Sequence, residues 1–235
     1  MSEPVVLEGA AEAGKQRAPL SRERVLRGAV AVADAGGIGA LTIRSLAQEL
    51  GVKPMSVYYH VANKEKILDG IVDIVFSEIY LPVVGGDWRA EIGQRARSAR
   101  RVLQKHPWAT PLLESRRTPG PATLRHHDAV LGTLRAGGFS LEATAHAYAV
   151  LDAVIYGHAL QEASLPFEGP DSVTEVAGPI MELMVAGEYP HMTEMVTTYY
   201  LQPGYDFANE FEFGLTMVLD ALTRMLTGQP SNLAS

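Results

Sequence analysis

The 235-residue chain contains no cysteine, which excludes disulfide scaffolds and thiolate metal sites. It also has no apolar run of about 18 residues, the length that a membrane-spanning helix requires. The first 15 residues carry three glutamates and lack the basic start and apolar middle of a secretory signal. We therefore expect a cytoplasmic protein without a membrane partner.

Overall positive charge is also missing, since the formal net charge is −7. Its distribution is uneven. Residues 15–66 hold nine basic and four acidic side chains, a net +5, whereas residues 67–235 hold 11 basic and 20 acidic ones, a net −9. A basic segment on an acidic body is typical of a small nucleic-acid-binding module, although chance clustering on solvated faces would give the same pattern.

Alternating strand patterns, internal repeats, phosphate-binding loops and dinucleotide fingerprints are absent as well. Apolar residues instead recur at helical spacing over most of the chain, which predicts an all-α protein. Residues 1–20 show no such spacing and are predicted to be a disordered tail. Beyond residue 80, we expect helices over Trp88–His106, Leu124–Ala136, Ser140–Ser164, Ser172–Ala186, His191–Tyr200 and Asp206–Leu226.

The segment from Leu41 to Lys64 reads as two short helices joined by a glycine turn. Ser21 is positioned to cap a preceding helix that Gly36 and Gly37 close, and Thr42 to cap the first of the two short ones. Gly51 suits the left-handed residue that ends a helix, and Pro54 suits the first turn of the next. This layout is that of a helix-turn-helix, which presents a few side chains to the DNA major groove.

The same residues carry a family resemblance. The run SRERVLRGAVAVADAGGIGALTIRSLAQELGVKPMSVYYHVANKEKILDGIVD resembles the DNA-binding domain of the tetracycline-repressor (TetR) family. Gly138-Phe139-Ser140-Leu141-Glu142 and Phe213-Gly214-Leu215 resemble, more loosely, the helix starts of its C-terminal core. The resemblance implies a helix-turn-helix domain over residues 21–67 and an effector-binding and dimerisation domain over 68–235.

A resemblance to this family implies double-stranded operator DNA as a partner. Lys53 and Lys64 are expected to contact phosphates, and Arg44 is the best candidate for a bidentate contact to guanine. Tyr58 and Tyr59 could instead pack partly into the core, and His60 could act as a cation at a helix end. The full predicted set comprises Thr42, Arg44, Lys53, Pro54, Met55, Ser56, Tyr58, Tyr59, His60 and Lys64.

The family also implies a homodimer, joined through the helices Ser140–Ser164 and Asp206–Leu226 as a four-helix bundle. The first helix presents small residues at four-residue spacing, which allow close helix approach, and the second helix presents large apolar side chains. Alternatively, both helices belong only to the internal core. The predicted interface residues are Ala145, Ala149, Ala153, Gly157, Leu215, Val218, Leu219 and Leu222.

A small-molecule effector is the third partner that the resemblance implies, bound in an apolar pocket with a few polar anchors. Tyr148, Asp152 and Tyr156 share one helical face. Because a buried carboxylate is costly alone, Asp152 either anchors the ligand or pairs with an arginine such as Arg95 or Arg116. The predicted pocket comprises Trp88, Arg95, Leu103, Trp108, Leu112, Tyr148, Asp152, Tyr156 and His158.

We expect neither a metal nor a cofactor in this pocket. Where the family's tetracycline binders hold drug and magnesium, alignment places Tyr80, Arg95, Glu114 and Gln161, which favours an organic ligand without metal. The neighbouring His126 and His127 point about 100° apart on a helix, so we expect solvent exposure rather than joint ligation.

The leading interpretation is thus a dimeric repressor that a small organic molecule releases from a palindromic operator. A ligand-sensing activator has the same sequence features. An enzyme on a helical scaffold is the alternative from another class, and its only hint is His158 near Asp152 or Glu162.

Overall fold

A computed structural model describes residues 19–113, 115–166, 170–184 and 187–228. Within these ranges every regular element is a helix, which confirms the predicted all-α class. The predicted N-terminal tail lies outside the described residues except for its last two positions.

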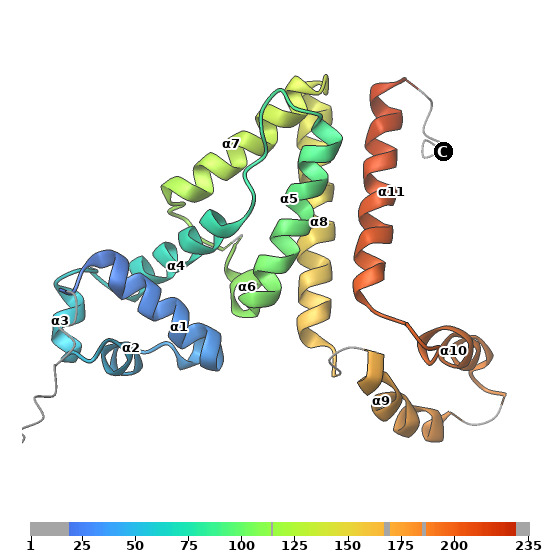
Figure 1. The fold of residues 1–235 in the computed structure, drawn as a ribbon, viewed down its shortest axis with the longest axis horizontal. Helices are drawn as coiled ribbons and strands as arrows, with labels where there is room; N and C mark the ends of the chain where they lie inside the picture. The colour runs from blue at the N-terminus through green and yellow to red at the C-terminus, as the bar shows by residue number, and fades with distance from the viewer. Residues whose placement is uncertain (1–18, 114, 167–169, 185–186, 229–235) are drawn as a thin grey trace, which may run out of the picture.

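The first three helices and the start of the fourth pack into one small unit (Figure 1). Ser21 caps the first helix, and Gly51 adopts the predicted left-handed conformation at φ 66°. At the predicted glycine stop, Gly37 interrupts the helical dihedrals with φ 74°, but helical structure resumes after it. The unit consists of α1 (Arg22–Ala40), α2 (Ile43–Leu50), α3 (Pro54–Tyr58) and α4 (Lys64–Glu78).

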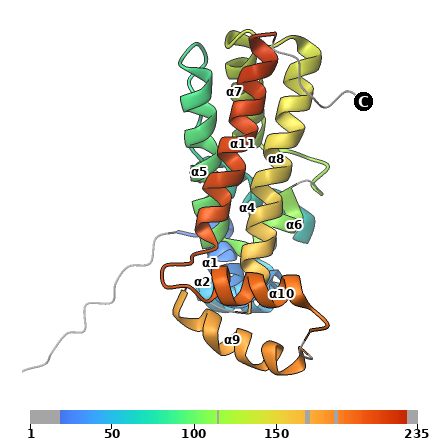
Figure 2. The same ribbon diagram turned by 90° about the vertical axis from the view of Figure 1, so that its right-hand side faces the viewer.

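A second unit consists of long helices packed around a common core. Their axes run roughly vertically in Figure 2. Its helices α5, α8 and α11 pack side by side, while α7 lies against α4 and α8. Two short helical segments, η1 and α6, lie between α5 and α7. The helices are α5 (Trp88–Lys105), η1 (Pro107–Ala109), α6 (Thr110–Leu113), α7 (Pro121–Ala136), α8 (Leu141–Ser164) and α11 (Ala208–Leu226).

Two differences in helix ends have simple causes. Helix α7 begins at Pro121, three residues before the predicted start, because proline is well suited to the first helical turn. The predicted helix His191–Tyr200 is instead α10 (Pro190–Met195), followed by a π-helical segment, η2 (Val196–Tyr200). Together with α9 (Pro170–Leu183), these form an arm that projects below α8 and α11 in Figure 1.

The arm encloses an apolar cavity of about 310 Å³ between α9, α10, η2 and the segment leading into α11. Its walls include Val176, Ile180 and Tyr200. This cavity contains none of the predicted effector residues.

The outer faces of α8 and α11 are partly apolar. Ala145, Ala149, Ala153 and Gly157 are exposed, as the predicted interface requires. On α11, however, the prediction is wrong for Leu215, Leu219 and Leu222, which are buried in the core, because their spacing of three and four residues follows the face that meets α5 and α8. The exposed apolar side chains of α11 are instead Phe213, Met217 and Met225, with Val218 half-buried.

Candidate DNA interface and effector core

The turn between α2 and α3 is fixed by local chemistry. Thr42 accepts a hydrogen bond from the backbone N–H of Ser45, and the Ser45 hydroxyl accepts one from the N–H of Thr42. This reciprocal capping box satisfies donors that the start of a helix would otherwise leave free. Helix α3 has only five residues and is held by Val57, which is fully buried. A helix this short depends on such packing, so its outer face is free to serve recognition.

The predicted DNA-contacting side chains lie on this outer face. Tyr59 is 86% exposed and Met55 68%, so neither belongs to the core. Ser56 and His60 are half-buried. The side chains that are exposed are Thr42, Arg44, Lys53, Pro54, Met55, Tyr58, Tyr59 and Lys64.

Three basic side chains stand out within the part of the chain that the structure describes. Arg44, Lys53 and Lys64 form no ion pair there, whereas Lys66, in the same first turn of α4 as Lys64, pairs with Asp69 at 3.2 Å. Unpaired cations around an exposed short helix provide the positive surface that phosphate binding requires.

A buried polar cluster occupies the second unit, between α5, α7 and α8. Arg95 of α5 is completely buried, and its Nη2 lies 2.7 Å from Oδ1 of Asp152 on α8. Its Nε also donates to Nε2 of His126 on α7 at 3.4 Å. Burial, the largest single influence, opposes the charge of Arg95, but the charge of Asp152, its hydrogen bond and the nearby Tyr156 and Tyr148 together outweigh burial and raise the pKa of the guanidinium.

Asp152 forms the arginine pair that was one of its two predicted roles, and its role in ligand binding stays a prediction. Its partner is Arg95, whereas Arg116 pairs with Glu65 at 3.0 Å and lies 3.7 Å from Asp69. The burial of Asp152 is therefore compensated without a ligand.

The cluster still contains polar atoms without partners. Nη1 of Arg95 and Nδ1 of His126 are buried with no hydrogen-bond partner among the described residues. Each such atom costs about 1–3 kcal/mol, so two on directly contacting side chains are unusual for a purely structural core. Beside them, burial and the negative charge of Asp152 raise the pKa of Tyr148.

His126 was predicted to be exposed, and this prediction is wrong, because the ring is 1% exposed and packs against Phe76 with centroids 5.3 Å apart. His127 is half-buried and also contacts Phe76. Burial, followed by the charges of Arg95 and His127, lowers the pKa of His126 to about 3. His126 thus stays neutral beside the arginine.

The structure divides the nine predicted effector residues. Arg95, Tyr148, Asp152 and Tyr156 belong to the buried cluster, as the effects of the last three on the Arg95 pKa show. The others pack elsewhere. Trp88 packs edge-on against Phe139, Trp108 binds Asp34, His158 stacks on Phe207, and Leu103 and Leu112 lie in the apolar core.

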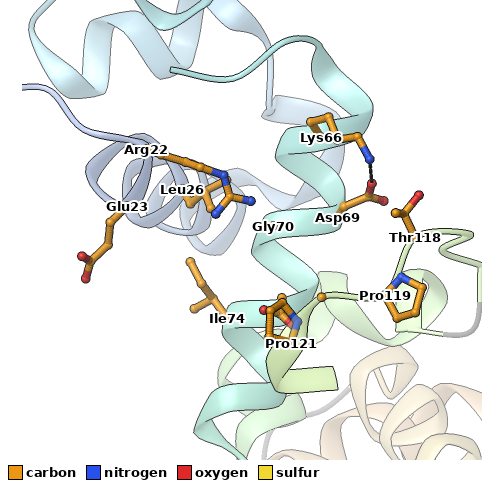
Figure 3. A pocket seen from close by; sticks show the side chains of 12 residues that line it. Arg22, Glu23, Leu26, Lys66, Asp69, Gly70, Ile74, Thr118, Pro119 and Pro121 are labelled. Carbon is orange, nitrogen blue, oxygen red and sulfur yellow. Dashed lines mark hydrogen bonds and ion pairs between the residues drawn. The ribbon is translucent and has the colours of Figure 1, made fainter. Parts of the chain in front are cut away.

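A crevice of about 320 Å³ marks the seam between the two units, lined by α1, α4 and the loop before α7. In Figure 3, Arg22 reaches across its mouth, and Lys66 meets Asp69 on the opposite rim. Asp73 of α4 also lines the crevice, and it accepts hydrogen bonds from the backbone N–H and hydroxyl of Thr123, at 2.8 and 3.0 Å. Asp73 thereby caps α7 from another helix.

Close backbone contacts reinforce this seam. A Cβ placed on Gly120 would lie 2.2 Å from Cγ of Asp73, and one on Gly70 would lie 2.6 Å from Leu26 of α1. Helix α4 is therefore closely packed against α1 on one side and against the start of α7 on the other.

The described helices include none long and apolar enough to cross a membrane. Among the described residues, no three His, Asp or Glu side chains are grouped so that they could hold a metal ion.

Comparison with known proteins identifies relatives over nearly the whole chain. Residues 25–71 match the family described as "Bacterial regulatory proteins, tetR family", and residues 81–226 match "Tetracyclin repressor-like, C-terminal domain". A transcriptional regulator of Saccharopolyspora erythraea is 38% identical over 121 residues, about half of either chain.

Two further relatives align over most of their length. The transcriptional repressor DrrR1 of Streptomyces coeruleorubidus is 32% identical over 212 residues, covering 86% of this chain and 77% of that protein. The structure of ActR from Streptomyces coelicolor in complex with actinorhodin superposes with a TM-score of 0.72 and 27% identity, covering 89% of this chain and 98% of that one.

Replacing Asp152 with alanine should destabilise the protein by about 3–5 kcal/mol, because Arg95 would be left buried without a counter-charge. Replacing Arg95 with methionine and Asp152 with leucine together should cost much less. Urea unfolding measures both. The control is Glu212→Ala, which removes a partly exposed ion pair between Glu212 and Arg97, a neighbour of Arg95 on α5. This change should lower stability by at most about 1 kcal/mol. A small loss in Asp152→Ala would contradict the paired assignment.

The low pKa of His126 should make the fold sensitive to acid. Below pH 6.5, the ordinary pKa of histidine, His126 binds a proton in the unfolded chain. In the folded protein the same ring stays unprotonated down to about pH 3. Stability should therefore fall as the pH drops, with His126 contributing a loss of about 2 kcal/mol between pH 7.5 and 5. Urea unfolding at both pH values should show this loss reduced in His126→Gln but not in His146→Gln, whose ring is exposed. Equal pH dependence in all three proteins would disprove the assignment.

Proposed function

The chain belongs to the TetR family and is a transcriptional repressor with a helix-turn-helix DNA-binding domain, and we propose that it binds a palindromic operator as a homodimer that a small organic effector releases. The observation that supports DNA recognition most directly is the exposed, unpaired basic surface around α3. Its partner is double-stranded DNA. No enzymatic role is proposed for His158, because the family is one of transcriptional regulators.

In this proposal, α3 enters the major groove. Lys53 and Lys64 flank it and neutralise phosphates, which sets the register but reads no sequence. Arg44 projects from α2 and pairs with a guanine edge. Tyr58, Tyr59 and His60 lie at the end of α3, where they contact bases or the sugar-phosphate backbone.

Dimerisation follows from the outer faces of α8 and α11. The exposed stripe of small residues on α8 allows close helix approach, and Phe213 and Met217 on α11 supply apolar area. Two such helices from each subunit form a four-helix bundle. The dimer places two recognition helices one DNA turn apart, about 34–36 Å, which matches a palindromic site.

We place the effector site at the Arg95 cluster. The unpartnered donors of Arg95 and His126 would be satisfied by acceptor oxygens on an organic ligand, and Tyr148 lies beside them. The relative ActR was crystallised with actinorhodin and with (S)-DNPA, which supports an organic effector and makes actinorhodin a first probe. The remaining predicted residues serve packing rather than ligand contact in this assignment.

Coupling between effector and DNA follows from α4. The helix begins in the DNA-binding domain, proposed at residues 21–67, and continues into the effector domain at 68–235. A ligand that displaces α5 or α7 would carry α4 and the recognition helix with it, since α4 is tied to both units.

Arg44→Ala should relax base preference at one operator position by about 1–3 kcal/mol, because a bidentate contact to guanine is lost. Lys64→Ala should weaken binding to all sequences alike. It should also reduce the slope of log affinity against log salt concentration by about one, because one phosphate contact is lost. Fluorescence anisotropy with operator variants from the chain's own promoter region distinguishes the two effects. Arg101→Ala, an exposed arginine on α5, should bind as the parent does. If the parent shows no salt-sensitive, sequence-preferring binding, DNA recognition itself is refuted.

Ala153→Glu should convert the dimer into a monomer, because two carboxylates would meet near the symmetry axis of the bundle. Sedimentation or mass photometry gives the assembly state. The matched control Leu124→Glu introduces the same charge at an exposed position of α7 and should leave the dimer intact. A monomeric parent, or an unaffected Ala153→Glu, would rule out this interface.

A further inference from the structure

The apolar cavity in the arm has the size and lining of a small-molecule site. Its volume of about 310 Å³ falls in the range of ligand pockets, which are concave and mostly apolar with a few polar groups. The lining consists of aliphatic and methionine side chains together with three aromatic rings, those of Tyr200, Tyr205 and Phe207. Met192 is 52% exposed and Ile180 43%, so the cavity is open to solvent on their side.

The two tyrosines of the lining connect the cavity to a carboxylate. The ring centroids of Tyr200 and Tyr205 are 5.1 Å apart, and both rings pack against Tyr199. Tyr199 donates a hydrogen bond from its hydroxyl to Oε1 of Glu210 at 2.8 Å. Burial, followed by the charge of Glu210, raises the pKa of Tyr205 to about 12. The hydroxyl of Tyr205 therefore stays neutral at physiological pH, and the negative charge of Glu210 acts on the cavity wall.

The arm carries charge of one sign. No lysine or arginine occurs between Arg135 and Arg224, and residues 165–213 hold nine acidic side chains and one histidine. His158 stacks on Phe207 of the lining, but burial lowers the pKa of His158, so its ring adds no positive charge at neutral pH. A concave site with low-dielectric walls focuses the field of such a segment. The cavity should therefore attract cations and repel anions.

Basic side chains of the neighbouring helix do not cancel this charge. Arg97 of α5 pairs with Glu212 at 2.8 Å, and Arg100 of α5 pairs with Glu162 at 2.5 Å. Glu210 forms no ion pair within the part of the chain that the structure describes. Its charge is thus available to a ligand.

We propose that the arm cavity binds a lipophilic organic cation, a molecule with an apolar body and a single amine charge. The body fills the apolar cavity, and the ammonium group lies beside the rings of Tyr200 and Tyr205 in the field of Glu210. Tyrosine rings attract cations, and a charge that stays close to solvent avoids most of its desolvation cost. This site is distinct from the effector site proposed at the Arg95 cluster, and binding to it can be measured without DNA.

Isothermal titration calorimetry of the full-length protein with three probes of similar shape tests the selectivity. The probes 1-naphthylmethylammonium, 1-naphthylmethanol and 1-naphthoate share one ring system and carry a positive, a neutral and a negative group. We expect the ammonium to bind about tenfold more tightly than the alcohol, and the carboxylate to bind most weakly. Equal affinities for the ammonium and the alcohol would overturn the proposal, and so would tighter binding of the carboxylate.

Nuclear magnetic resonance of the full-length protein with ¹³C-labelled isoleucine methyl groups locates the site. Ile180 lines the cavity and is the only isoleucine after Ile155, whereas Ile92 lies one turn from Arg95 on α5. The ammonium probe should shift the Ile180 signal, assigned with Ile180→Val, and leave that of Ile92 unchanged. A shift at Ile92 alone would place the probe at the Arg95 cluster and overturn the proposal. An Ile180 signal that responds to protein concentration but not to the probe would also overturn it, because a second copy of the chain would then cover the cavity.

Two substitutions separate the volume of the cavity from its charge. Ala177→Trp should fill the cavity and weaken binding of the ammonium at least about tenfold. Glu210→Gln keeps an acceptor for Tyr199 but removes the charge, so the preference for the ammonium over the alcohol should fall about threefold or more. Glu142→Gln makes the same change at an exposed position in the first turn of α8, the end opposite the arm, and should match the parent.

Either variant can contradict the assignment. Parental affinity in a folded Ala177→Trp would exclude the cavity, and parental selectivity in Glu210→Gln would exclude the charge. The isoleucine measurement uses the unaltered protein, so it decides the location of the site whatever the folding of Ala177→Trp.

Discussion

The whole arrangement depends on one helix, α4, being packed on two sides at once. Its Gly70 lies so close to α1 that any side chain there would meet Leu26, and one turn later Asp73 caps α7. Among the described residues, α1 also meets the bundle at η1, where Asp34 contacts His106 and Trp108. A helix held this closely cannot bend to absorb a displacement, so motion at one end is transmitted to the other.

The local part of this architecture was predictable from sequence. Ser21, Thr42, Gly51 and Pro54 each perform a capping or turn function that depends only on neighbouring backbone, and each appears where its chemistry indicated. Such signals are short-range, which is why helix bounds were reproduced within a few residues over most of the chain.

The buried polar cluster was only half predictable. The spacing of Tyr148, Asp152 and Tyr156 marked one face of α8, and the cost of a lone carboxylate named Arg95 as a possible partner. His126 was misjudged because local geometry could exclude joint metal binding with His127 but could not show that α7 turns this ring toward Phe76. The inward face of α11 was likewise fixed by its neighbours, since a helix with apolar residues on two faces does not itself indicate which one meets the core.

Two polar clusters, at Arg95 and at His106, differ in a way that bears on regulation. At Arg95 the charges are paired one to one inside the bundle, and a well-packed apolar substitute would be about as stable, so stability alone does not account for the ion pair. At His106 one buried ring contacts carboxylates of α1 and α4, so its two contacts join separate helices rather than filling a core. Arg95 lies on α5, and His106 directly follows the end of that helix. In the proposed function, a ligand that competes for Arg95 therefore acts on the helix whose far end meets α1 and α4.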